Sequence, residues 1–303
     1  MQSKKILLSI VGPTASGKTA LSLKLAEHFK SEIVSADSRQ FYKELTIGTS
    51  KPTEAQMMTV RHHFVNSHSI KDVFNVGSFE KRVLPLIEEL MIHKPIVVMV
   101  GGSGLYCKAV WEGLDEMPEI PLQLRSSIMQ EIQYAGLSPL LNELLAKDPL
   151  YYAQVDKQNT VRIVRAMEVI RATGKSFSSF RLNKKAPRTF ENIKIGIDLD
   201  REVLYSRIDA RMDGMVAAGL FDEVKSLLPF KDLNALQTLG YSEIFGNLAG
   251  DYDREETLRL LKRNSRRYAK RQLTWFQKDP EIEWVNPNDV TGIISKVMAR
   301  LRA

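Results

Sequence analysis

The sequence predicts an α/β fold in which a parallel sheet forms the core and a helical segment is inserted into it. Three observations lead to this prediction. Apolar β-branched segments alternate with amphipathic segments, a glycine-rich loop directly follows the first apolar segment, and a long central segment has helical periodicity alone. Strands that alternate with helices pair in parallel through right-handed crossover connections.

Four apolar segments have the length and composition of buried strands, namely residues 4–11, 32–37, 95–102 and 193–199. Two of the segments that separate them carry apolar side chains at helical spacing, namely residues 19–29 and 79–94. Beyond residue 200 the chain is expected to be mainly helical.

The pattern changes between Trp111 and about Asn192. Three helices and no clear strand are predicted there, over residues 122–136, 138–148 and 160–174. We therefore expect two domains: a core of residues 1–112 plus 193–303, and a helical insertion of residues 113–192. Residues 181–192 would be the linker that returns the chain to the core.

The composition is that of an ordinary soluble protein, with 303 residues of which 44% are hydrophobic and 26% charged. The longest apolar run is far short of the ~20 residues of a membrane span, so we expect no membrane contact. The basic, then apolar N-terminus mimics a signal peptide but runs into the glycine-rich loop without a cleavage site. The single cysteine, Cys107, excludes an internal disulfide, fits the cytoplasm and is expected to be a packing residue.

Basic residues are concentrated in two segments of this chain, whose net charge is +7. Lys157–Arg188 contains nine Lys and Arg and one acid, Glu168, and Thr257–Lys278 contains eight Lys and Arg and no acid. Solvated helix faces normally mix the two signs. The distribution therefore favours a polyanionic partner such as a nucleic acid.

The glycine-rich loop GPTASGKT matches the phosphate-binding pattern G-x-x-x-x-G-K-[ST], after a strand and before a helix. It predicts a P-loop NTPase-like core, in which backbone N–H groups and Lys18 bind phosphate and the Thr19 hydroxyl binds Mg²⁺. The phosphate-binding residues would be Gly12, Pro13, Thr14, Ala15, Ser16, Gly17, Lys18 and Thr19. The strand at 95–102 ends without the second acid of ATP-hydrolysing enzymes, which argues against a motor-type ATPase.

Asp37 follows the second predicted strand, at the carboxyl edge where open α/β sheets bind ligands. An aspartate there can accept a proton from an incoming nucleophile. It can equally be a turn or capping residue, for which the sequence Asp-Ser is suitable. The local motif leaves both interpretations open.

Eight segments resemble, in the same order and nearly end to end, the tRNA dimethylallyltransferases, also called tRNA isopentenyltransferases. They are residues 12–19, 35–42, 47–52, 101–106, 165–175, 207–224, 239–243 and 266–276. The resemblance implies that dimethylallyl diphosphate donates its prenyl group to N6 of the adenosine 3′-adjacent to the anticodon in tRNA. The loop would then hold the diphosphate leaving group with Mg²⁺, in place of ATP. A monomer that binds the anticodon stem-loop in the cytoplasm is expected.

The resemblance also implies a role for each catalytic residue. Asp37 would take the proton, Lys18 and Thr19 would bind the diphosphate and Mg²⁺, and Arg211 would reach the diphosphate. Without the resemblance, an exposed ion pair with a neighbouring aspartate, Asp209 or Asp213, would be the simpler interpretation of Arg211. Ser103, where the family usually has threonine, keeps the hydroxyl that contacts the target adenosine.

Contacts with tRNA are implied for residues from both predicted domains. They are Asp37, Ser38, Arg39, Gln40, Ser103, Arg125, Arg162, Arg165, Lys270, Arg271, Gln272 and Trp275, with residues 237–242 beside them. If residues 263–270 are helical, their cations share one face, and Tyr268 and Trp275 lie on another. Core packing is the simpler interpretation of these two aromatic side chains. The basic end of the insertion would grip the anticodon stem.

Two other classes of protein remain open on the residues alone. The phosphate-binding loop and Asp37 also suit a small-molecule kinase, although such an enzyme needs neither basic segment. A non-catalytic RNA-binding protein with a nucleotide switch would need neither Asp37 nor Arg211.

Overall fold

The computed structural model describes residues 4–302, and a six-stranded parallel sheet lies at its centre. The strand order is β3-β2-β4-β1-β5-β6. The strands are β1 (Ile6–Val11), β2 (Ile33–Ser35), β3 (His62–His63), β4 (Ile96–Gly101), β5 (Glu191–Ile197) and β6 (Ile282–Val285). The α/β fold with a parallel sheet is as predicted.

The four predicted strands correspond to β1, β2, β4 and β5, and together they form the middle of the sheet. Strand β1 is central, since Ile6 lies opposite Ile96 of β4 on one side and Glu191 of β5 on the other. The edge strands β3 and β6 were not predicted. They have two and four residues, and β6 lies in the part of the chain that we expected to be mainly helical.

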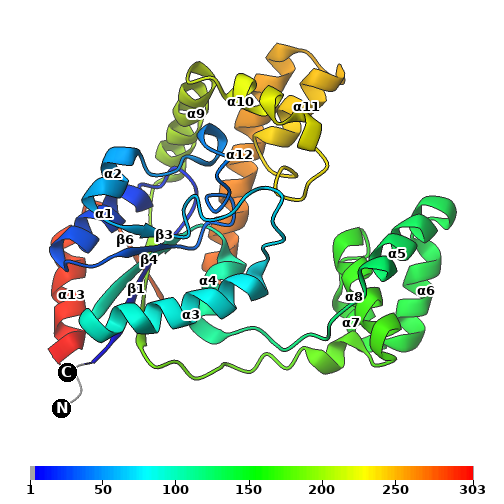
Figure 1. Cartoon of the computed structure of the whole chain (residues 1–303), viewed down its shortest axis with the longest axis horizontal. Helices are drawn as coiled ribbons and strands as arrows, with labels where there is room; N and C mark the ends of the chain where they lie inside the picture. Colours follow the sequence, from blue (N-terminus) through cyan, green and yellow to red (C-terminus); the bar gives the residue numbers. More distant parts are fainter. Residues whose placement is uncertain (1–3, 303) are drawn as a thin grey trace. The chain divides into compact units, whose positions relative to one another are not determined.

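Helices cover both faces of the sheet (Figure 1). Helices α1 (Lys18–His28) and α13 (Val290–Arg302) pack on one face, where Leu21 and Val297 join the apolar core. Helices α3 (Val76–His93) and α4 (Gly104–Glu112) pack on the other, with Phe79 and Cys107 in a second core layer. Burial raises the pKa of the Cys107 thiol to about 12, as expected for a packing residue.

The segment GGSGLY connects β4 to α4. Gly101 is the last residue of β4 and Gly104 the first of α4, so the turn itself is two residues long. Helix α4 is anchored to the core by Cys107 and Trp111, which are buried.

The C-terminal helices form a further apolar cluster beside the sheet. They are α9 (Arg201–Ala217), α10 (Leu220–Ser226), α11 (Tyr241–Ala249) and α12 (Arg254–Phe276). Their buried contacts include Met212, Leu220, Tyr241 and Leu261. Helix α9 begins where the Asp200 carboxylate accepts two backbone N–H groups, which is a favourable N-cap.

The chain divides into two compact units. The first runs to Trp111 and resumes at Pro187, and the second is Glu112–Ala186. The second unit contains α5 (Leu122–Ala135), α6 (Ser138–Lys147), α7 (Pro149–Gln154) and α8 (Thr160–Thr173) around its own apolar core. Three of these helices were predicted. The fourth, α7, is short. It begins at a proline, and the side chain of Asp148 caps the helix.

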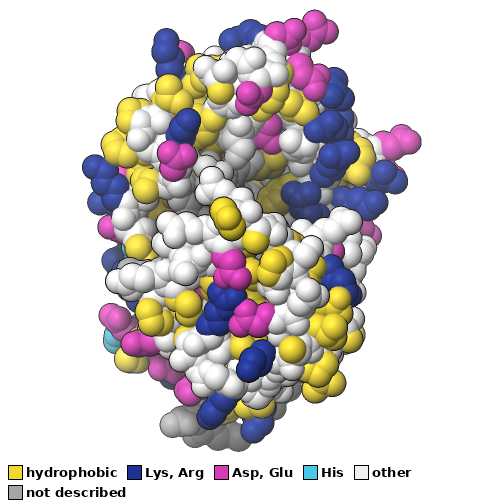
Figure 2. All heavy atoms as spheres, turned by 90° about the vertical axis from the view of Figure 1, so that its right-hand side faces the viewer, with side chains coloured by type: hydrophobic (Ala, Val, Ile, Leu, Met, Phe, Trp, Pro, Cys, Tyr) yellow, Lys and Arg dark blue, Asp and Glu magenta, His cyan; other side chains and the backbone are white. Residues whose placement is uncertain are grey.

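Basic side chains are unevenly distributed over the surface. Figure 2 shows Lys and Arg gathered at the upper right of the face that it displays, with few acidic side chains among them. Within residues 4–302, no helix is both long and apolar enough to cross a membrane.

Candidate active site

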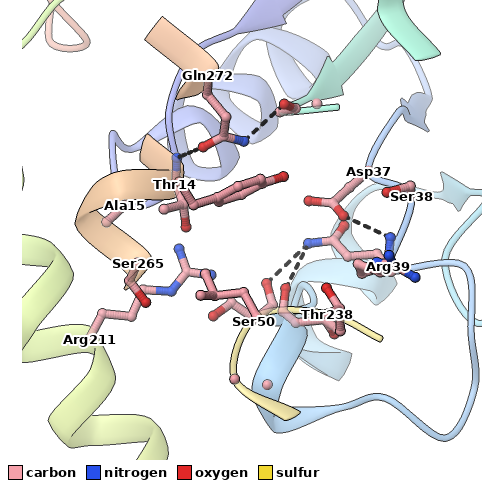
Figure 3. Close-up of a pocket in the computed structure, with 18 of the residues that line it drawn as sticks. Thr14, Ala15, Asp37, Ser38, Arg39, Ser50, Arg211, Thr238, Ser265 and Gln272 are labelled. Carbon is pink, nitrogen blue, oxygen red and sulfur yellow. Dashed lines mark hydrogen bonds between the residues drawn. The ribbon is translucent and has the colours of Figure 1, made fainter. Parts of the chain in front are cut away.

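Three segments meet at one edge of the sheet because β1, β4 and β2 are neighbouring parallel strands. The phosphate-binding loop, residues 12–19, follows β1, the turn 102–103 follows β4, and residues 36–40 follow β2. These segments, with α9 and α12, line a cavity of about 430 Å³. Figure 3 shows this cavity, with Arg211 directed into it from α9 and Asp37 from the opposite side.

The phosphate-binding loop has the geometry that its sequence predicts. Gly17 has φ +96°, a left-handed conformation that favours glycine, and α1 begins at the next residue. The Lys18 ammonium donates to the Pro13 carbonyl at 2.5 Å and closes the loop. The Ser16 hydroxyl is buried and has no hydrogen-bond partner within residues 4–302. Lys18 and Thr19 both line the cavity.

Gln272 of α12 supports this loop from behind. Its carbonyl oxygen accepts the Thr14 N–H at 2.8 Å, and its amide nitrogen donates to the Gly102 carbonyl at 2.9 Å. A Cβ atom at position 102 would lie 2.3 Å from that nitrogen, so a larger residue there would displace the Gln272 amide. The buried amide holds two cavity loops together, a structural role in addition to the tRNA contact that the resemblance predicts.

Asp37 has the turn role that its sequence context allowed, in a geometry that is also compatible with the role of proton acceptor. One carboxylate oxygen accepts the Arg39 N–H at 3.0 Å, which is the turn role. The other oxygen has no hydrogen bond to any described residue, and the side chain lines the cavity. The turn therefore fixes the carboxylate and leaves one oxygen available to a substrate.

Arg211 does not form the exposed helix ion pair that was its simpler interpretation. Asp209 instead binds Arg266 at 2.6 Å, and Asp213 binds Lys262 at 2.6 Å. Both cations belong to α12, so this helix neutralises the acids beside Arg211. Arg211 lines the cavity, and burial lowers the pKa of its guanidinium while the charge of Asp37 opposes that shift.

The electrostatics of the cavity favour an anionic ligand. Burial and, second to it, the positive charge of Arg211 lower the pKa of Lys18 to about 8, against the opposing effect of Asp37. Two cations that share a poorly solvated site are each destabilised in the charged form. A phosphate group bound between them would remove that penalty.

The loop that carries Asp37 is held by its own predicted RNA-binding residues. The Ser38 N–H donates to the Ser103 hydroxyl at 3.0 Å. The Arg39 guanidinium donates to the carbonyls of Asn234 and Ala235, at 3.2 and 3.1 Å. These contacts tie the turn after β2 to the turn after β4 and to the loop before α11.

Gln40 is also used within the protein. Its amide nitrogen donates to the carbonyls of Thr49 and Ser50, and its oxygen accepts the Ser35 hydroxyl. Thr238, from the predicted segment 237–242, and Tyr268, for which core packing was the simpler interpretation, line the cavity. So do Ser50 and Ser265, which sequence reasoning did not assign to the site (Figure 3). No local pattern distinguishes them from surface or core residues.

The exposed side of α12 forms a second, basic hollow of about 360 Å³. Its lining consists of Arg267, Lys270, Arg271, Thr274, Trp275 and Lys278. Trp275 is 42% exposed, so the core packing that we favoured for it is wrong. Arg266 belongs to the ion pair with Asp209 and does not line this hollow.

The remaining predicted RNA contacts lie in the helical unit. Arg125 is on α5, and Arg162 and Arg165 are on α8. Arg162 is exposed, and the other two arginines bind the carboxylate of Glu168. The helical periodicity of these segments does not predict that Glu168 binds both arginines.

The fold and the cavity define an α/β protein of the P-loop NTPase-like class, with a phosphate-binding loop and an aspartate at the same end of its sheet. The model of the IPP transferase family matches residues 40–279, and the chain belongs to this family. It is 49% identical to the tRNA dimethylallyltransferase of Cytophaga hutchinsonii over 98% of each chain, and 48% identical to that of Christiangramia forsetii over 92% of each.

Solved structures that are similar to this chain are enzymes of the same kind. The tRNA isopentenylpyrophosphate transferase of Bacillus halodurans is 34% identical, with a TM-score of 0.74 over 99% of this chain and 97% of that one. A eukaryotic dimethylallyltransferase acting on tRNA, 24% identical, shares the fold with a TM-score of 0.79 over 95% of this chain and 75% of that one. Family membership confirms the resemblance and places the chain among prenyltransferases, apart from kinases and nucleotide switches.

Proposed function

We propose that the protein transfers the dimethylallyl group of dimethylallyl diphosphate to N6 of the adenosine 3′-adjacent to the anticodon in tRNA, and releases diphosphate. The observation that carries this proposal is one cavity that joins a phosphate-binding loop, two half-buried cations and a carboxylate with a free oxygen. The names of the relatives supply the chemistry, and the cavity supplies a place for each reacting group.

In the proposed reaction, the N6 nitrogen attacks C1 of the dimethylallyl group. The new C–N bond forms as the C1–O bond breaks, and the bonding electron pair leaves with the diphosphate. The N6 lone pair is delocalised into the adenine ring, so the amine becomes a useful nucleophile only as it loses a proton. Asp37 accepts this proton on its free carboxylate oxygen.

The diphosphate would be held by the backbone of the loop with Lys18 and Arg211. A guanidinium bridges two phosphate oxygens, and Lys18 adds a point charge. Each well-placed donor to a developing anion contributes about 3–4 kcal/mol to the transition state. The arriving anion would also raise the pKa of Lys18 again and keep it protonated.

The prenyl group would occupy the apolar part of the cavity wall. Ile208, Met212 and Met215 of α9 line the cavity together with Leu220 and Leu239. Flexible methionine side chains adapt to a small branched ligand. Their apolar surface would keep water away from C1 while the leaving group departs.

The residues of the loop fit a diphosphate-bound Mg²⁺. The buried, unpartnered Ser16 hydroxyl and the Thr19 hydroxyl are hard oxygen donors at the start of α1. Among the described side chains, no three His, Cys, Asp or Glu gather as a metal site, so Thr19 would share the ion with diphosphate oxygens and water. Bound there, the ion would neutralise charge on the leaving group.

The RNA would lie across the basic surfaces of both units. Lys270, Arg271 and Trp275 border the hollow on α12, where a tryptophan can stack on a base that has left the helix. Arg125, Arg162 and Arg165 would bind phosphates of the stem. The protein would act as a monomer, and its tRNA substrate supports a cytoplasmic site of action.

Product analysis tests this function. The purified protein is incubated with unmodified tRNA, Mg²⁺ and dimethylallyl diphosphate, and the digested RNA is analysed by mass spectrometry. We expect C5H8 on an adenosine beside the anticodon. ATP in place of the prenyl donor is the control. Phosphorylation from ATP without prenylation would refute the proposal.

A further inference from the structure

The helical unit contains two clusters of arginine and carboxylate side chains that differ in charge. In the first, which we call the Glu168 triad, one carboxylate binds Arg125 and Arg165. In the second, the Arg171 cluster, one guanidinium binds Glu131 and Glu143. The Glu168 triad has a formal charge of +1, and the Arg171 cluster has a formal charge of −1.

The carboxylate of the Glu168 triad is hidden and its two partners are not. Glu168 is 3% exposed, whereas the side chains of Arg125 and Arg165 are 53% and 41% exposed. One carboxylate oxygen accepts from Arg125 of α5 at 2.9 Å, and the other accepts from Arg165 of α8 at 3.3 Å. A single buried anion thus fixes two exposed cations that come from different helices.

The two arginines of the triad keep most of their hydrogen-bonding capacity. Each uses one terminal nitrogen toward Glu168 among the described contacts, out of five N–H donors in a guanidinium. Arg171, by contrast, donates from its Nε and both terminal nitrogens and is 23% exposed. The triad can bind a further anion, and the Arg171 cluster cannot.

Glu168 occupies a position that stability alone would give to an apolar residue. It lies on the buried side of α8, where Val164, Met167 and Val169 belong to the apolar core. A buried ion pair is often no better for stability than apolar residues of the same volume. It is also the one acid in the basic segment Lys157–Arg188. A role for the charge itself would explain its presence.

We propose that Glu168 is a positioning residue for RNA, which aims the free guanidinium edges of Arg125 and Arg165 at phosphates of the tRNA stem. This inference rests on the proposed function. The pair acts as one preformed phosphate grip on the surface of the helical unit, so less side-chain freedom is lost when RNA binds.

A positioning role and a simple charge effect predict opposite changes in RNA affinity when Glu168 is neutralised. Removing an acid makes the charge of the helical unit more positive, so electrostatics alone predict tighter RNA binding. If Glu168 aims the arginines, its loss weakens binding, because the side chain of Glu168→Gln can no longer attract both cations. The sign of the change therefore separates the two explanations.

The experiment compares Glu168→Gln with Glu143→Gln in the full chain. Glu143→Gln removes the same charge from the same unit, and Arg171 keeps Glu131. We expect Glu168→Gln to weaken tRNA binding about tenfold and to reduce the salt slope by about 1, near the value of one lost phosphate contact. The KM for dimethylallyl diphosphate should stay constant, and Glu143→Gln should bind tRNA at least as well as the parent.

A second background covers the case in which Glu168→Gln loosens the helical unit. When Arg125→Gln and Arg165→Gln are already present, nothing remains to be positioned, so adding Glu168→Gln should change tRNA affinity less than about twofold. A further tenfold loss in that background, or unchanged or tighter binding by Glu168→Gln alone, would overturn the positioning role. A parent protein that neither binds nor modifies tRNA would overturn the proposed function and this inference with it.

Discussion

At the scale of single residues, the chemistry of the cavity depends on which charges the protein leaves unpaired. Asp209 and Asp213 flank Arg211 along α9, yet both are bound by cations of α12. Arg211 is therefore directed into the cavity, where a bound anion would pair with its guanidinium. Asp37 is likewise paired only in part: one carboxylate oxygen accepts a hydrogen bond within its turn, and the other is available to a substrate.

We expect Arg211→Lys to lower kcat/KM for dimethylallyl diphosphate by about 10²-fold, since an ammonium cannot bridge two phosphate oxygens. Steady-state kinetics at saturating tRNA measures this effect. Arg201→Lys, an exposed change at the start of the same helix, is the matched control. Equal losses in both variants would mean that Arg211 has no special contact with the diphosphate.

The pKa of Lys18, lowered to about 8, makes the proposed diphosphate site sensitive to pH. In the free enzyme Lys18 is charged below that pH, so kcat/KM for the prenyl donor should fall as pH rises through about 8. The kcat should persist to higher pH, because bound diphosphate restores the ammonium. A kcat/KM profile that stays flat to about pH 9.5 would contradict this role.

The same shift has a defined effect on folding. Because the pKa of Lys18 is lower in the folded chain than its ordinary 10.5, the folded state binds fewer protons between the two values. Lys18 thus destabilises the fold below pH about 8, and this contribution fades as pH rises toward 10.5.

At the scale of elements, local patterns predicted the middle of the sheet and the longer helices. Strands β1, β2, β4 and β5 lie in segments rich in Ile, Val and Leu, and such segments carry their own signal. The edge strands β3, with two histidines, and β6, with the sequence Ile-Glu-Trp-Val, lack that signal. The role of Gln272 was not predictable, because its amide binds the N–H of Thr14, 258 positions earlier in the chain.

The support that α12 gives to the phosphate-binding loop yields a testable contrast on one helix. Gln272→Met keeps the volume but loses both hydrogen bonds to the loops. We expect the KM for dimethylallyl diphosphate to rise about tenfold, while the KM for tRNA stays within about twofold. Kinetics with each substrate varied in turn measures the two values.

Lys270→Ala, on the exposed side of the same helix, should give the converse result: a raised KM for tRNA and a constant KM for the prenyl donor. If Gln272→Met changed the KM for tRNA alone, Gln272 would be an RNA contact, as the resemblance had implied.

At the scale of the whole molecule, the predicted site residues are distributed over both compact units. Lys18, Asp37 and Arg211 meet in one cavity although they are far apart in the sequence, and only the resemblance linked Arg211 to the other two. Arg125, Arg162 and Arg165 lie in the helical unit. Basic residues outside the cavity are concentrated in the segment Lys157–Arg188 and on the exposed side of α12.

These surfaces predict tRNA binding that depends steeply on salt. Each phosphate contact contributes about 0.7–0.9 to the slope of log K against log salt, so five or six contacts give a slope of about −4 to −5. Filter binding or anisotropy between about 50 and 300 mM salt measures it. Binding that does not change over that range would exclude a phosphate-dominated interface.

The measurement that tests the central claim most directly is a single-turnover reaction of Asp37→Asn with tRNA and dimethylallyl diphosphate. Asparagine can keep the oxygen that accepts the Arg39 N–H but cannot take a proton from N6. We predict that both substrates bind with affinities close to those of the parent, while prenyl transfer slows by at least about 10²-fold. Transfer at the parental rate with both substrates bound would show that Asp37 is not the base.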